Sequence, residues 1–227
     1  MAEAFKIVFI LYPRLTQLDF TGPFEVLSRL PGAEVIVACK EGGVIASETG
    51  LHFAELAKLS DIPSCDMICI PGGPGQTDAM TDVAFMDEVR RLGAGARYVT
   101  SVCTGSLILA AAGLLQGKRA ACHWAYRELL SLFGAIPDPA RVVRDGNVIT
   151  GGGVTAGIDF ALTVAAELRG EEVAQTLQLM IEYAPAPPYN CGRPETASPE
   201  LVAAVKQRFS AFSQARERAM QDIAARA

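Results

Sequence analysis

Short apolar segments alternate with helix-like segments along this chain, and this alternation is the feature that most constrains its fold. Residues 5–11 (FKIVFIL) are apolar at almost every position, as a parallel strand covered on both faces would be. Residues 33–39, 65–70 and 96–102 have a similar character. Helix-like segments separate them, which predicts an α/β fold with a doubly wound, mostly parallel sheet and helices on both faces.

The other elements are predicted from turn and capping residues. A first helix is expected from Thr21 as its N-cap, with Pro23 in its first turn. Residues 41–60 and 141–150 are expected to form hairpins. The remaining helices are expected within residues 82–95, 104–115, 117–134, 151–168, 171–184 and 199–225. No repeat or linker interrupts the pattern, so we expect one domain over residues 1–227, with the last helix at about 199–225.

Composition excludes several classes of function. The chain has 227 residues, half of them hydrophobic, and a formal net charge of −5 without a basic stripe, so we expect no nucleic-acid partner. No segment has the length and apolarity of a membrane span, and the N-terminus does not resemble a secretory signal, so we expect a cytoplasmic protein without a membrane partner. Six cysteines and two histidines, without metal-ligand spacing, predict free thiols and no metal site.

One cysteine lies where a predicted strand changes into a predicted helix. In residues 101–105 (SVCTG), Cys103 follows the strand and Gly105 leaves room for a tight turn, as in a nucleophile elbow with cysteine in place of serine. The N–H groups and dipole of the following helix are expected to lower the pKa of the thiol and favour the thiolate. The alternative is a packed core cysteine, since free cysteine is among the most buried residue types.

Two further loops are expected at the same edge of the sheet, because the carboxyl ends of parallel strands lie together. Asp19 lies in an apolar segment after the first strand, where it either caps a helix or acts beside Cys103 as a protonated general acid. Gly72 and Gly73 follow another strand and allow a ligand to approach the backbone. His123 is expected to be a packed side chain rather than a catalytic base.

Several segments together resemble the ThiJ/PfpI superfamily, and in particular its isocyanide hydratase branch. They are LDFTGPFEVL, CIPGGPG, TSVCTGSLILAAAGLLQGKRA, HWAY, VVRDGNVITGGGVTAGIDFAL and EYAPAPPYN. The resemblance runs from about residue 6 to about residue 195. It implies a flavodoxin-like fold, a homodimer, and Cys103 as the nucleophile with Asp19 as its acidic partner. Thr104 matches the hydratase-like branch, whereas protease-like and deglycase-like branches often have histidine at that position.

The implied activity is the addition of water to an isocyanide, which gives an N-substituted formamide through a covalent thioimidate on Cys103. No cofactor or metal is implied, and Gly72, Gly73 and Thr104 are the expected substrate and oxyanion contacts. Alternatives are a glyoxalase or deglycase of the same superfamily, or a non-enzymatic thiol sensor or ligand-binding regulator. The related domains of AraC-type regulators carry a DNA-binding module that the remaining residues cannot accommodate.

Overall fold

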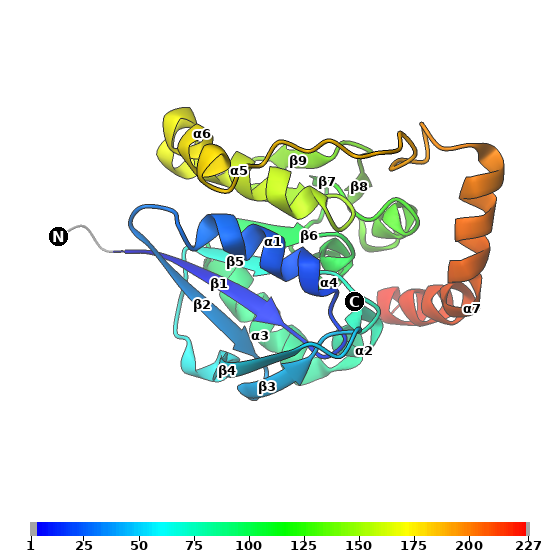
Figure 1. The fold of residues 1–227 in the computed structure, drawn as a ribbon. Helices are drawn as coiled ribbons and strands as arrows, with labels where there is room; N and C mark the ends of the chain where they lie inside the picture. Colours follow the sequence, from blue (N-terminus) through cyan, green and yellow to red (C-terminus); the bar gives the residue numbers. More distant parts are fainter. Residues whose placement is uncertain (1–3, 226–227) are drawn as a thin grey trace.

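The computed structural model describes residues 4–225 and, for residues 210–217, the backbone alone. Its centre is an eight-stranded sheet with the strand order β3-β4-β2-β1-β5-β6-β10-β9 (Figure 1). The strands are β1 (Phe5–Leu11), β2 (Ala33–Cys39), β3 (Gly43–Ala46), β4 (His52–Lys58), β5 (Met67–Ile70), β6 (Tyr98–Val102), β9 (Val142–Asp145) and β10 (Val148–Gly151). The six central strands pair in parallel, and the edge strands β3 and β9 pair antiparallel to their neighbours. A separate pair joins β7 (Arg119–Ala120) to β8 (Ile136–Pro137).

Helices cover both faces of the sheet, which confirms the predicted doubly wound α/β fold. One face carries α1 (Gln17–Leu27) and α5 (Ala156–Arg169), with α6 (Glu171–Met180) packed on α5 (Figure 1). The other face carries α2 (Gln76–Thr81), α3 (Val83–Gly95) and α4 (Gly105–Ala111). The strands between them are apolar on both sides because both faces are covered. Ile7, Phe9 and Ile68 are accordingly fully buried.

The first helix begins five residues earlier than the sequence predicted. Its N-cap is Thr16, and the Thr21 hydroxyl donates to the Gln17 carbonyl at 3.0 Å within the helix. Pro23 therefore lies inside the helix rather than in its first turn, and its ring leaves the carbonyl of Asp19 without the usual partner four residues on. Asp19 itself lies in the first turn, where its side chain is buried beneath the helix and makes no N-cap bond.

The segment after β7 also differs from its prediction. Residues Arg127–Phe133 form a 3₁₀ helix instead of an α-helix, and Gly134 ends it with a φ of 74°. The short helix α2 was not expected, because six residues are too few to show a clear amphipathic period. Neither difference changes the order of the central strands.

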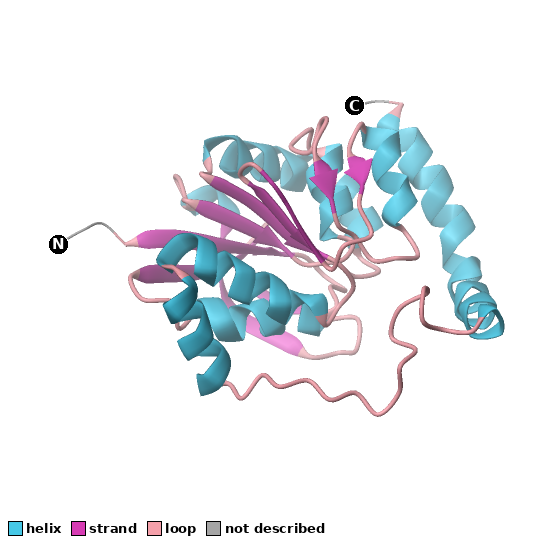
Figure 2. Cartoon of the chain, turned by 90° about the horizontal axis from the view of Figure 1, so that it is seen from above, coloured by secondary structure: helices cyan, strands magenta, loops and turns pink. Residues whose placement is uncertain are grey.

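The last helix, α7 (Pro199–Ala224), lies beyond the carboxyl ends of the central strands. An extended segment carries the chain from α6 across to α7 (Figures 1 and 2). Helix α7 contacts α2 and the 3₁₀ segment, and its Met220 is fully buried. The helix therefore covers the edge of the sheet at which α/β proteins bind ligands.

Within residues 4–225, none of the helices combines the length and the apolar character that a membrane span requires. The described residues also contain no group of three or more His, Cys, Asp or Glu side chains suited to a metal ion.

Candidate active site

Cys103 lies on a strained turn between β6 and α4. Its φ of 59° is in the left-handed region that non-glycine residues rarely occupy. The strain is supported by hydrogen bonds from the Cys103 N–H to the carbonyl oxygens of Gly151 and Gly152, at 3.0 and 2.9 Å. A Cβ atom at Gly105 would collide with the carbonyl oxygen of Ile70 at the end of β5, so the turn needs glycine there. The backbone thus has the nucleophile-elbow geometry that the sequence predicted.

The carboxyl group of Asp19 lies in the same buried environment. The Gly72 N–H donates to its Oδ2 at 3.0 Å, whereas Oδ1 has no hydrogen bond of good geometry among the described residues. Burial raises the pKa of Asp19 to about 7, although the side chain of Cys103 and the Gly72 N–H act in the opposite direction. This pKa agrees with the prediction of a carboxyl that retains its proton more readily than a surface aspartate.

The expected lowering of the Cys103 pKa is wrong. Burial raises the pKa of the thiol well above its ordinary value, and the nearby Asp19 and Cys122 raise it further. Backbone N–H groups of Val154 and Thr104 favour the thiolate but do not outweigh burial. Sequence reasoning weighed the helix dipole without the burial of the sulfur, and only 5% of Cys103 is exposed.

Above the pKa of Asp19, the Asp19 carboxyl and the Cys103 thiol are therefore best described as a pair that shares one proton. With one proton between them, the pair is either a carboxylate beside a thiol or a carboxylic acid beside a thiolate. The two forms have the same net charge, so transfer of the proton between them does not add a charge to the buried site. The N–H groups directed at the sulfur stabilise the second form, in which the nucleophile is ready to react.

The backbone N–H groups of Gly72 and Gly73 connect the loop after β5 to Asp19 and Thr104. The Gly72 N–H binds Asp19, and the Gly73 N–H donates to Thr104 Oγ1 at 3.0 Å. Both N–H groups have partners inside the protein, so neither is free for the oxyanion contact expected of Gly72 and Gly73. The backbone of Thr104, the third expected contact, instead lies beside the sulfur with that of Val154. Gly73 and Thr104 also line the cavity beside Cys103.

A cavity of about 450 Å³ opens beside the sulfur of Cys103. Three aromatic rings form part of its wall: His123 and Tyr126 lie 5.8 Å apart, and each lies 5.9 Å from Phe209 of α7. A small molecule can therefore reach Cys103, although little of the residue is exposed to solvent.

Sequence reasoning missed two parts of this wall. Tyr126 belongs to the HWAY segment, and its spacing from His123 was a usable local signal. Phe209 had none, because it is brought to the site by α7 from more than a hundred residues away. His123, predicted to be packed, does stack against Trp124 and accepts the Ala125 N–H at 3.3 Å on Nδ1, but it also lines the cavity.

Gly72→Ala is expected to lower the free energy of unfolding by about 1–3 kcal/mol, as overpacking of a closed site does. Its Cβ would lie 2.5 Å from the Thr104 backbone nitrogen and 2.8 Å from Asp19 Oδ2. Denaturant unfolding measures the change, with Gly95→Ala in α3 as the control because a Cβ there meets nothing within 4 Å. Equal stability of the two variants would contradict the tight packing described here.

The fold and the site together define a class: flavodoxin-like α/β proteins that carry a cysteine on a nucleophile elbow at the carboxyl edge of the sheet. Comparison with known proteins gives the particular family. The model of the DJ-1/PfpI family matches residues 5–167, and the chain belongs to this family.

Three relatives show how far the similarity extends. The chain is 53% identical over 205 residues to the isonitrile hydratase of Pseudomonas putida, an alignment that covers 90% of each protein. The crystal structure of a ThiJ/PfpI family protein from Pseudomonas syringae superposes with a TM-score of 0.92 at 39% identity, covering 97% of this chain and 90% of that one. Protein dj-1beta of Drosophila melanogaster is 29% identical, over 77% of this chain and 96% of its own length.

Proposed function

We propose that the protein is an isonitrile (isocyanide) hydratase, a cysteine-dependent hydro-lyase. The observation that carries the proposal is the pairing of the elbow thiol of Cys103 with the buried carboxyl of Asp19, beside a cavity that a small molecule can enter. The 53% identity to the Pseudomonas putida isonitrile hydratase supports it. The reaction adds one water molecule to R–N≡C and gives the formamide R–NH–CHO.

The site residues suggest a sequence of steps. The Cys103 sulfur bonds to the terminal isocyanide carbon, and the proton shared with Asp19 moves to that carbon, which gives a thioimidate R–N=CH–S–Cys103. The ionised Asp19 then takes a proton from water as the hydroxyl bonds to the same carbon. One water proton ends on the nitrogen. The C–S bond breaks as the C=O bond forms, and the second water proton returns to the thiol–carboxyl pair.

The direct test is an assay of the purified protein with a small aromatic isocyanide. We expect formamide to accumulate in proportion to the isocyanide consumed, measured by chromatography or infrared loss of the N≡C stretch. Consumption of methylglyoxal without isocyanide turnover would favour the glyoxalase or deglycase alternative instead. A thiol that reacts only with peroxide and changes a partner interaction would favour the sensor.

The aromatic wall of the cavity favours an apolar, ring-bearing R group. Phe209→Ala is expected to raise KM for an aromatic isocyanide roughly tenfold, because one side of the apolar contact is lost. KM for methyl isocyanide should change little, since the small group does not extend to the ring. Leu201→Ala is the matched control on the same helix; it is 43% exposed and lies outside the cavity lining. Equal effects on both substrates would contradict this role.

We also propose that the protein acts in the cytoplasm as a homodimer of single-domain chains. Exposed apolar side chains support an interface between copies: Leu179 is 81% exposed, Met180 65% and Tyr189 76%. Light scattering coupled to size-exclusion chromatography measures the assembly directly, and a monomer at micromolar concentration would contradict the proposal.

A further inference from the structure

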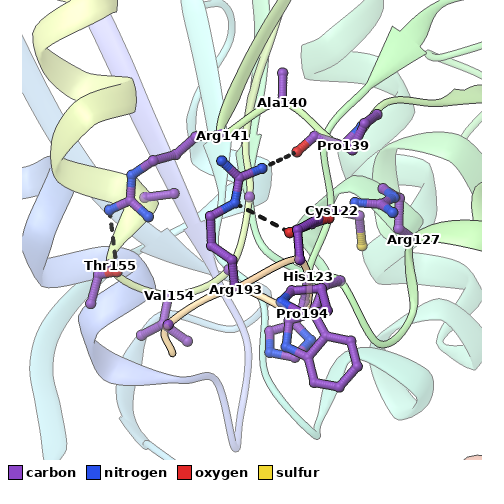
Figure 3. Close-up of a pocket in the computed structure, with 16 residues that line it drawn as sticks. Cys122, His123, Arg127, Pro139, Ala140, Arg141, Val154, Thr155, Arg193 and Pro194 are labelled. Carbon is purple, nitrogen blue, oxygen red and sulfur yellow. Dashed lines mark hydrogen bonds and ion pairs between the residues drawn. The ribbon is translucent and has the colours of Figure 1, made fainter. Parts of the chain in front are cut away.

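A second, smaller cavity adjoins the active-site cavity. Its volume is about 220 Å³, and His123 and Val154 line both cavities, so a shared wall separates them. Three arginines line the second cavity: Arg127, Arg141 and Arg193 (Figure 3). The proposed hydration of an isocyanide uses none of them, so the presence of three arginines in one lining requires a separate explanation.

Arg141 is anchored within the wall. Its guanidinium pairs with Asp159 Oδ2 at 2.7 Å and donates to Thr155 Oγ1 at 3.2 Å. Thr155 makes no side-chain cap on α5, so its hydroxyl serves the arginine instead. Arg141 therefore holds the wall in place, and Asp159 offsets its charge.

Arg127 and Arg193 have weaker partners. The Arg127 Nε lies 3.6 Å from a carboxylate oxygen of Glu128, whose side chain is 81% exposed. Arg193 donates to the Pro139 carbonyl at 3.1 Å, and its Nε lies 3.5 Å from Glu195. The exposed Arg193–Glu195 pair contributes little stability. The Arg127 side chain is only 19% exposed, and its contact with Glu128 is long. Each guanidinium has five N–H donors, so most donors of these two side chains remain available to a ligand.

The lining of the cavity carries little negative charge of its own. Thr155 and Ala156 at the N-terminus of α5, a helix of 14 residues, lie in the lining, and the Asp159 carboxylate in the first turn of α5 is paired with Arg141. Among the described lining residues, Glu195 is the only carboxylate. Figure 3 shows Arg193 between Arg141 and Arg127, with the Arg141 guanidinium directed to Thr155.

We propose that this cavity is a binding site for a small oxyanion, either a carboxylate or a phosphate. Arg193 and Arg127 bind the oxyanion through charge-assisted hydrogen bonds, and Arg141, held by Asp159 and Thr155, fixes the wall beside it. The anion is either a free metabolite or a carboxylate carried by the substrate, and both sources present the same chemistry to the arginines. The arginines line a different cavity from the one beside Cys103, and of the described residues only His123 and Val154 line both.

The single tryptophan of the chain gives a direct readout of binding. Trp124 lines this cavity and stacks on His123 with ring centroids 5.8 Å apart. Titration with malonate or inorganic phosphate, at constant ionic strength against chloride, is expected to change its fluorescence saturably. Arg127→Gln combined with Arg193→Gln should weaken binding at least roughly tenfold. Arg90→Gln, a surface arginine paired with Asp87 on α3, is the matched control and should bind as the parent does.

A variant with the opposite expected sign strengthens the test. Glu195→Gln removes the carboxylate that competes for Arg193, so it should tighten binding several-fold. Because the Arg193 side chain is 51% exposed, Arg193→Gln alone should fold even if the double variant does not, and it should also weaken binding. No saturable change relative to chloride would overturn the proposal. Binding that survives Arg193→Gln and is not tightened by Glu195→Gln would overturn it as well.

The source of the anion is resolved by kinetics with two isocyanides. If the anion is part of the substrate, malonate should inhibit an isocyanide that bears a carboxylate competitively and leave a neutral aromatic isocyanide unaffected. If it is a free anion, malonate should bind without competing with either substrate. The fluorescence titration does not depend on turnover, so failure of the proposed hydratase activity and failure of the anion site give different results.

Discussion

Cys103→Ala is expected to lower the rate of formamide formation by at least about a thousandfold, because Cys103 supplies the only thiol among the described residues that line the cavity. Cys103→Ser should also be nearly inactive. A hydroxyl is a far weaker acid than a thiol, and burial raises the pKa of this position further. The measurement is formamide production by purified variants whose circular dichroism spectra match the parent.

The control is Cys191→Ser, which changes a cysteine that is exposed on the loop before α7. It should retain full activity. Mass spectrometry of the parent, quenched during turnover, should show an adduct of the isocyanide mass on Cys103 and none on Cys191. An active Cys103→Ala protein, or an adduct on another cysteine, would end the proposed mechanism.

Asp19→Asn should reduce hydratase activity by at least about a hundredfold, the usual range for loss of a general acid–base group. The amide has the shape of the carboxyl, and its oxygen can still accept the Gly72 N–H, so the local packing should persist. What is lost is the shared proton, which the first step delivers to the isocyanide carbon. Activity of the variant is measured in the same formamide assay as for Cys103→Ala.

Asp19→Asn is expected to lower activity but to raise stability at alkaline pH. The two opposite effects separate a catalytic role of Asp19 from a structural one. The pKa of Asp19 is raised from 3.8 to about 7, so between these values the folded protein binds a proton that the unfolded chain has released. Stability therefore falls as pH rises through this window, by as much as about 4 kcal/mol. The amide of the Asp19→Asn variant does not ionise, so this variant should be more stable than the parent at pH 8 and similar to it near pH 4.

Denaturant unfolding of both proteins across this pH range measures the difference. Asp78→Asn is the matched control: its side chain is 75% exposed in an ion pair with Arg14, and the substitution should change neither activity nor the pH dependence by much. If the difference in free energy of unfolding between the parent and Asp19→Asn is the same at pH 4 and at pH 8, the buried carboxyl does not titrate as described.

The fold and the main chemical groups could be read from local patterns. Apolar runs such as Phe5–Leu11 predict buried parallel strands because their side chains must be covered on both faces. The elbow at Cys103 was also predictable, because a strand that ends at a cysteine, with a glycine two residues later, is typical of a tight strand-to-helix turn. The start of α1 was not, since Pro23 is compatible with either a first turn or an interior position.

The sequence by itself determined the doubly wound sheet, the cysteine on its turn and the carboxyl that follows the first strand, because each depends on residues close together in the chain. Only the tertiary structure decided the protonation of the pair and the shape of the cavity. Burial sets both pKa values, and burial is the sum of contacts from distant elements. Phe209 reaches the site in the same way, through a helix whose position no local pattern specifies.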